Sequence, residues 1–257
     1  MINKETLQRD LENIGLKRGD IVLAHISMKA IGWIELGEYA LIHAFQDVIG
    51  KEGTLCLAGH SRCGPPWFKE PVKIWHGFET PIYGRTPQAM RLVPGVYRSI
   101  HPCVSMLAWG ADAKRLVANH DYIGTPCGIG TPWYKLATEY GDHAKILRIG
   151  FHTTTMVDVA MDTVAPEKGL TPAYVTRVFL GASEPCNPDL QYWIDRPFRY
   201  CLPAHIRDAR FHGINLPRLW KMLEPNTVSG KVGNCMSYIT NAGQTYRILS
   251  EMAKETK

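Results

Sequence analysis

The strongest constraint in this sequence is the alternation of helix-periodic segments with short, wholly apolar runs. Three apolar runs are bounded by turn residues and have the length of buried strands: 21–24, 54–57 and 146–149. Apolar residues at helical spacing occupy the segments between and beyond them: 7–14, 38–49, 88–93, 111–119, 157–164 and 244–254. Helices that alternate with short buried strands indicate an α/β fold.

Two stretches interrupt this alternation. Residues 59–84 combine glycines, prolines and aromatics with little period, which is typical of a functional loop or lid and, equally, of a structured surface excursion. Residues 165–225 are rich in proline and poor in clear period, so we interpret them as a loop-rich region that forms part of a substrate pocket. No internal repeat or linker is visible, and 257 residues suit a single domain.

Charge and cysteine content argue against several classes of protein. The net charge is +5, but Lys and Arg are scattered, which argues against a nucleic-acid partner. Seven cysteines without a Cys-x-x-Cys pair argue against a disulfide framework or a zinc site and favour free thiols in a reducing compartment. No signal core and no run of about 18 apolar residues occurs. We therefore expect a cytoplasmic protein without a metal or a membrane partner, and the sequence leaves a homodimer open.

A first candidate site is the turn after the first apolar run, where open α/β sheets bind ligands. Residues 25–33 read His-Ile-Ser-Met-Lys-Ala-Ile-Gly-Trp. Gly32 and Gly37 would let the backbone approach a bulky anion, and the helix that starts near Glu38 offers free amide groups. The glycine spacings of dinucleotide sites and P-loops are absent, so a plain structural turn is the alternative.

Two further segments concentrate polar groups. Residues 98–105 contain an arginine, two serines and a histidine, and such a histidine is more often a structural hydrogen bonder than a catalyst. In the segment 150–162, Asp158 and Asp162 are four residues apart and share one face of a predicted helix. Their mutual repulsion would make one of them a better proton acceptor and a plausible general base. A helix cap beside a solvated charge is the alternative.

Together these segments resemble the aminoglycoside 3-N-acetyltransferase family. The similarity begins with the Gly-Asp and His-x-Ser elements of residues 16–27, includes Arg-Ser-Ile-His-Pro at 98–102 and Gly-Ile-Gly-Thr-Pro at 128–132, and ends with Gly-Lys-Val-Gly-Asn at 230–234. It covers nearly the whole chain and is weakest at 165–225. The resemblance implies a three-layer α/β/α sandwich with a central mixed sheet, formed by residues 1–257 as one domain. It also implies acetyl-CoA as co-substrate and direct transfer to an amine in a ternary complex.

The resemblance further assigns cofactor contacts to particular residues. In the family, the His-x-Ser segment with its glycine turn and the Arg-Ser-x-His-Pro segment contact the pantetheine and phosphates of coenzyme A. The residues of this chain that match those positions are Ser27, Met28, Lys29, Ile31, Gly32, Ser99 and Ser105.

The sequence departs from the family where the catalytic base is expected. Family members usually carry Asn-Thr-Thr-x-His-x-x-Glu after the third strand, with the histidine as base and the glutamate orienting it. Here Asp158 occupies the histidine position and Met161 the glutamate position, with Asp162 one residue later. We therefore expect Asp158 to act as the base beside Asp162. His152, six residues before Asp158, is the next candidate.

The acceptor is a second point of departure. A pocket for a polycationic aminoglycoside should be lined with carboxylates, yet residues 165–225 contain eight Lys and Arg and no acidic cluster. We expect a coenzyme A-dependent N-acyltransferase whose small-molecule amine is a biosynthetic intermediate rather than an aminoglycoside. A repurposed hydrolase, cyclase or thioester-condensing enzyme on the same scaffold is one alternative, and a non-catalytic coenzyme A-binding protein is another.

Overall fold

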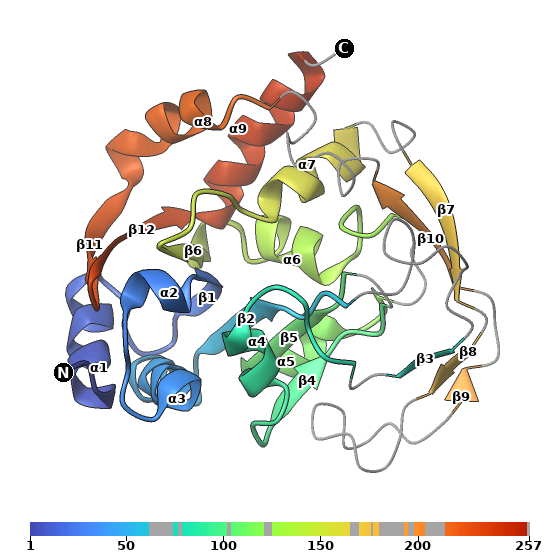
Figure 1. The fold of residues 1–257 in the computed structure, drawn as a ribbon. Coiled ribbons are helices and arrows are strands. Elements are labelled where there is room, and N and C mark those ends of the chain that lie inside the picture. The colour runs from blue at the N-terminus through green and yellow to red at the C-terminus, as the bar shows by residue number, and fades with distance from the viewer. Residues whose placement is uncertain are drawn as a thin grey trace.

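The computed structural model describes the chain with several gaps. The described residues are 1–61, 74–76, 79–101, 104–120, 125–164, 170–175, 177–179, 193–194, 198–203 and 214–255. Their centre is a seven-stranded mixed sheet with the strand order β11-β12-β6-β1-β2-β5-β4 (Figure 1). Its strands are β1 Ile21–Ile26, β2 Thr54–Ala58, β4 Val96–Arg98, β5 Met106–Gly110, β6 Ala144–Ile149, β11 Val228–Val232 and β12 Cys235–Asn241.

The middle of the sheet is parallel and both edges are antiparallel. Strand β1 pairs in parallel with β2 and with β6, so that Ile21 lies opposite both Thr54 and Ala144. Beyond this centre, β12 and β11 add antiparallel strands next to β6, while β5 and β4 do so next to β2. The carboxyl ends of β6, β1 and β2 therefore meet at one edge of the sheet, where α/β proteins place their ligands.

Helices cover both faces of this sheet. On one face lie α1 Lys4–Asn13, α2 Met28–Ile31, α3 Gly37–Ile49 and α4 Arg85–Met90. On the other lie α5 Ala113–Val117, α6 Pro132–Thr138, α7 Met156–Val164, α8 Leu216–Leu223 and α9 Ala242–Glu255. Alternate residues of a strand enter opposite cores: Val22 packs with α1 and α3, whereas Leu23 packs with α6, α7 and α9. The predicted three-layer sandwich is confirmed.

The sequence predicted the buried strands best. The runs 21–24, 54–57 and 146–149 all lie within the parallel strands β1, β2 and β6. The helix expected at 88–93 was misplaced, since α4 spans Arg85–Met90, and that expected at 111–119 is shorter, as α5 spans Ala113–Val117. The antiparallel strands β4, β5, β11 and β12 were not anticipated. β4, β11 and β12 carry no continuous apolar run, whereas β5 does, at residues 106–109, and was missed.

The two stretches without clear period contain short strands that pair with each other. Strand β3 Ile74–His76 pairs in parallel with β8 Arg177–Phe179, which pairs with β9 Trp193–Ile194. Strand β7 Leu170–Val175 pairs with β10 Phe198–Pro203. Within 165–225, four strands and helix α8 are thus ordered elements that the sequence did not predict, and the remaining residues of 165–213 lie outside the described part. No described helix has both the length and the apolar character needed to cross a membrane.

Candidate functional site

Polar side chains gather where the parallel strands β6, β1 and β2 end. His25 is the next-to-last residue of β1 and lies opposite Arg148 of β6, and His60 follows β2 by two residues. Strand alternation places His25 on the same face as Leu23, the face covered by α6, α7 and α9. Asp158, in the first turn of α7, interacts electrostatically with both imidazoles. Sequence elements more than 130 residues apart therefore form one polar cluster.

Burial keeps both imidazoles of this cluster neutral. It lowers the pKa of His25 to about 4, and nearby His60 and Arg148 add to this effect, while the Asp158 carboxylate opposes it. Burial also lowers the pKa of His60 to about 4, again opposed by Asp158. Among the described residues, the Nε2 atoms of His25 and His60 have no hydrogen-bond partner. Each ring therefore has a buried nitrogen whose hydrogen-bonding capacity the described residues leave unsatisfied.

The two predicted carboxylates of α7 have different environments. Asp162 is 5% exposed, and its carboxylate accepts a hydrogen bond of 2.7 Å from the backbone N–H of Cys127. It therefore anchors the loop before α6. Asp158 is half-buried and lies within electrostatic range of the imidazoles of His25 and His60. Of the two, only Asp158 belongs to the polar cluster.

The expected cofactor turn forms helix α2 and its cap. The Ser27 hydroxyl caps α2 by accepting from the Ala30 N–H, and Lys29 is exposed while Ile31 is fully buried. A Cβ at Gly32 would lie 2.4 Å from Asn234 Nδ2. The close approach that Gly32 permits is therefore to the turn between β11 and β12. The Asn234 N–H also donates to Ile31 O at 3.0 Å. The segments 25–33 and 230–234, which the sequence analysis identified separately, therefore pack together.

Ser105 lies inside a hydrogen-bond network centred on Arg98. Its hydroxyl donates to Gly59 O at 2.6 Å and accepts from Arg98 Nε at 2.9 Å. Arg98 also donates to Gly59 O and to Glu79 O. The network joins β4 and β5 to the chain that follows β2, and the Ser105 side chain is fully buried within it.

Ser99 is equally enclosed and fixes the protonation of His120. Its hydroxyl accepts from the Met106 N–H at 2.7 Å and lies 2.8 Å from His120 Nδ1, while His120 Nε2 lies 2.9 Å from Pro126 O. A carbonyl only accepts, so Nε2 carries the hydrogen and Nδ1 accepts from Ser99. Burial lowers the pKa of His120 to about 3, in keeping with this neutral ring. The His101 ring lies 4.6 Å from it, centroid to centroid.

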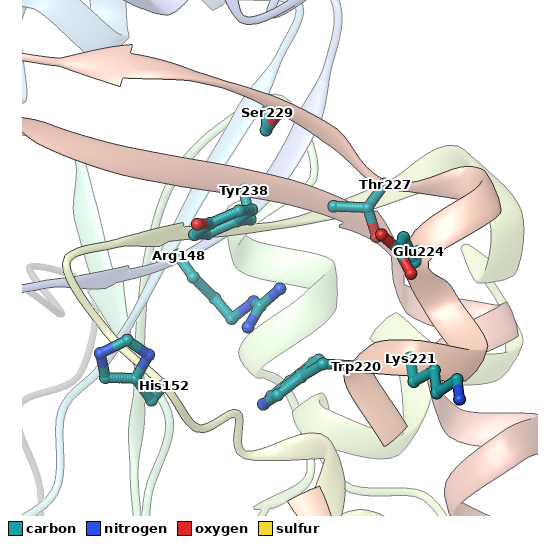
Figure 2. A pocket seen from close by; sticks show the side chains of 8 residues that line it. All are labelled: Arg148, His152, Trp220, Lys221, Glu224, Thr227, Ser229 and Tyr238. Atoms are coloured by element: carbon teal, nitrogen blue, oxygen red, sulfur yellow. The ribbon is translucent and has the colours of Figure 1, made fainter. Parts of the chain in front are cut away.

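His152 lies apart from the polar cluster, at a pocket of about 420 Å³ between α8 and strands β6, β11 and β12 (Figure 2). The floor of the pocket is Arg148, whose guanidinium carbon lies 3.6 Å from the centre of the Trp220 ring and 5.3 Å from that of Tyr238. Lys221 and Glu224 complete its charged lining. Arg148 also lies opposite His25 in the sheet, so the pocket adjoins the polar cluster.

Comparison with known proteins identifies the family of this chain. The family model for aminoglycoside 3-N-acetyltransferases matches residues 23–254, which is most of the sequence. The chain belongs to this family. Two curated relatives are aminoglycoside N(3)-acetyltransferase VII of Streptomyces paromomycinus, 34% identical over 164 residues, and aminoglycoside N(3)-acetyltransferase IX of Micromonospora chalcea, 33% identical over 170 residues. These matches cover 58% and 60% of this chain, and it spans less than three fifths of each relative's length.

Solved structures share the fold over nearly the whole chain. Aminoglycoside acetyltransferase AAC(3)-Xa superimposes with a TM-score of 0.79 at 24% identity, covering 99% of this chain and 93% of that protein. The YokD protein of Bacillus subtilis gives 0.76 at 22% identity and covers 98% of both chains. AAC-IIIb, in a binary complex with CoASH, gives 0.74 at 21% identity, covering 98% of this chain and 96% of that one. These similarities establish an acetyltransferase-family fold.

Sequence reasoning about this family member missed His25 and His60 as site residues. His25 was visible in the His-x-Ser segment, but its role depends on strand alternation, which turns it toward α7 and away from α2. His60 lies two residues after β2, so the convergence of parallel strand ends could have marked it. In the described part of the chain, no group of three or more His, Cys, Asp or Glu side chains is arranged to hold a metal ion.

Proposed function

We propose that the protein is a coenzyme A-dependent N-acyltransferase, which transfers an acyl group from acetyl-CoA or a related thioester to an amine of a small molecule. Membership of the acetyltransferase family over residues 23–254 supports this activity. The observation that carries the proposal is the position of Asp158 beside the neutral imidazoles of His25 and His60, at the edge where the parallel strands end.

Proton transfer is the step for which these residues are suited. An amine is protonated at neutral pH and must lose a proton before its nitrogen attacks a carbonyl carbon. We assign this proton to the half-buried carboxylate of Asp158. Acetyl-CoA, when bound, would supply the activated thioester. The amine nitrogen would form the N–C bond as the C–S bond breaks, and the departing thiolate would take up the second proton that the nitrogen loses. The neutral rings of His25 and His60 are hydrogen-bonding groups beside the carboxylate.

The predicted cofactor residues fall into two groups. Ser27, Met28 and Lys29 have half-buried or exposed side chains at α2, so they are accessible to a pantetheine chain or a phosphate. The side chains of Ile31, Ser99 and Ser105 are enclosed by protein, so they would support the site from behind. We propose that coenzyme A binds along the first group. Micromolar affinity, roughly −8 kcal/mol, is expected in a calorimetric titration.

The substitution Asp158→Asn tests the base directly. It should lower the rate of thiol release from acetyl-CoA in the presence of an acceptor by about 10²–10⁴ and leave the coenzyme A affinity unchanged, because general-base assistance is worth that much. Asp142→Asn, at an exposed site that pairs with Arg247, is the matched control and should change neither quantity. Full activity of Asp158→Asn would contradict the assignment. No heat and no thermal shift with millimolar coenzyme A would contradict the transferase itself.

The acceptor that we propose is a biosynthetic intermediate rather than an aminoglycoside. The basic balance of residues 165–225 and the net charge of +5 support this choice, because a polycation is repelled by such a surface. Kanamycin and gentamicin should therefore be poor acceptors in the same thiol-release assay. Efficient acetylation of either, saturating at low micromolar concentration, would overturn this part of the proposal.

A further inference from the structure

Arg148 carries a buried charge that has no counter-ion among the described residues. It is 5% exposed, and it forms no hydrogen bond or ion pair with any described residue. Burial lowers its pKa to about 10, so it stays charged at neutral pH. A desolvated charge is costly unless it is paired and hydrogen-bonded. The fold therefore maintains an unfavourable arrangement at this position, which is typical of a binding site.

The Arg148 side chain lines the pocket and lies between two aromatic rings. The ring of Trp220 covers one face at 3.6 Å, and Tyr238 lies on the other side at 5.3 Å; Figure 2 shows the guanidinium between the two rings. The N–H groups of a guanidinium point outward in its plane, where a carboxylate or phosphate accepts two parallel hydrogen bonds. Stacking holds that plane fixed, so the donors are already oriented for an anion.

The rest of the pocket also favours a small anion. Lys221 and the exposed His152 add hydrogen-donating groups, and Ser229 also lines the pocket. The Thr227 hydroxyl donates to Leu223 O at 2.8 Å. Glu224 is the one carboxylate among the lining residues; it is exposed and forms no ion pair with Arg148. A volume of about 420 Å³ suits a small molecule.

The pocket lies beside the proton-transfer cluster. Arg148 and His25 are direct neighbours on adjacent parallel strands, and their side chains project from the same face of the sheet. A ligand whose anionic end occupies Arg148 therefore extends toward His25 and Asp158. We infer that the acceptor carries an anionic group, a carboxylate or phosphate, which binds the edge of Arg148 while its amine is directed to Asp158. This inference rests on the proposed function and names its substrate class.

The anion site can be tested without any transfer reaction. Inorganic phosphate, titrated by calorimetry at constant ionic strength into the full chain without coenzyme A, should bind the wild type saturably. Arg148→Met should weaken this binding at least tenfold. Arg18→Met, which removes the same charge at an exposed position before β1, should not change it. Absence of saturable phosphate binding, or equal binding to Arg148→Met, would overturn the site even if acyl transfer is real.

Paired acceptors test the substrate class. A series of ω-amino carboxylates and their carboxamides should show a preference for the carboxylates of tenfold or more in kcat/KM with acetyl-CoA. Arg148→Met should abolish that preference and leave the affinity for coenzyme A unchanged, whereas Arg18→Met should retain it. Equal use of acids and amides by the wild type contradicts the inference. A selective loss of coenzyme A affinity in Arg148→Met also contradicts it, because the anion would then be a cofactor phosphate.

Discussion

Arg98 on β4 and Arg148 on β6 are two arginines of the seven-stranded sheet that are almost inaccessible, at 1% and 5% exposure. Arg98 donates hydrogen bonds to Ser105 Oγ and to the carbonyls of Gly59 and Glu79. Arg148 makes no such bond in the described part of the chain and contacts the rings of Trp220 and Tyr238 instead. The Arg98 guanidinium is therefore hydrogen-bonded within the protein, whereas the Arg148 guanidinium has no hydrogen-bond partner among the described residues.

The difference separates a structural arginine from a ligand-binding one. Hydrogen bonds to charged groups in the interior are each worth about 1.5–3 kcal/mol, so Arg98 stabilises the junction of β2, β4 and β5. Stacking alone fixes the orientation of Arg148 but leaves its desolvation uncompensated. The histidines divide in the same way: both ring nitrogens of His120 are hydrogen-bonded, whereas Nε2 of His25 has no partner in the described residues.

Acidification is expected to have the largest effect on the free energy of unfolding, because it acts on the buried histidines near Arg98 and on those near Arg148. Burial lowers the pKa of His25 and His60 to about 4, that of His120 to about 3, and that of His101 well below its usual value. The unfolded chain takes up protons below pH 6.5 or so, and the folded state does not. The free energy of unfolding should therefore be constant above that pH and fall below it, by about 1.4 kcal/mol per pH unit for each histidine.

Urea unfolding at about pH 7.5, 6 and 5 measures this loss. His120→Asn removes one buried titrating ring and should flatten the pH dependence, although its stability at neutral pH is lower. His43→Asn, at an exposed position of α3, should leave the dependence unchanged. A free energy of unfolding that is the same at pH 7.5 and 5 would show that these rings are protonated in the folded state.

The substitution Arg98→Met should give the next largest decrease in the free energy of unfolding. It leaves the Glu79 carbonyl and the Ser105 oxygen without the donors that Arg98 supplies, and the Gly59 carbonyl with the Ser105 hydroxyl alone. We therefore expect a loss of about 3–5 kcal/mol in the free energy of unfolding. Chemical denaturation measures it. Ser105→Ala should cost less, because Arg98 keeps its hydrogen bonds to the carbonyls of Gly59 and Glu79. A loss below about 1 kcal/mol for Arg98→Met would mean that the network is not structural.

Much of the fold was predictable because buried parallel strands are continuous apolar runs. The apolar segments 21–24, 54–57 and 146–149 predict β1, β2 and β6. The helical spacing of 38–49 and 244–254 predicts α3 and α9. The pairs β4–β5 and β11–β12 were not predicted. Strands β4, β11 and β12 mix apolar and polar residues, whereas β5 has an apolar run at 106–109 that the sequence analysis missed. The pairing of β3 with β8 joins segments about 100 residues apart, and local pattern does not encode such a contact.

The site was only partly predictable for a related reason. The segment around Asp158 could be located by its place after a strand, and Asp158 lies in the first turn of α7, the helix that follows β6. Its role as a base stays a prediction. The different surroundings of Asp162, and the enclosure of Ser99 and Ser105, follow from contacts made by distant residues such as Cys127 and Gly59. The stacking of Arg148 between two rings depends on α8 and β12, more than 70 residues away in sequence.

The smallest effect on stability is expected for Arg148→Met, the same substitution at the other buried arginine. A methionine can fill the space between Trp220 and Tyr238, and replacement of a buried charge by an apolar side chain of similar volume is often neutral or stabilising. The gain from removing a desolvated charge offsets the lost stacking, which is worth about 0.5–2 kcal/mol. The variant should therefore fold normally and lose phosphate binding.

The free energy of unfolding of Arg148→Met, determined by urea denaturation at neutral pH in a low-salt buffer without phosphate, tests most directly whether this charge serves a ligand. Wild type and the exposed control Arg18→Met are measured alongside it. A value within about 1 kcal/mol of the wild type, or above it, is the predicted result. A loss of about 3 kcal/mol or more, comparable to that expected for Arg98→Met, would show that Arg148 stabilises the fold and would contradict its assignment as the anion-binding residue.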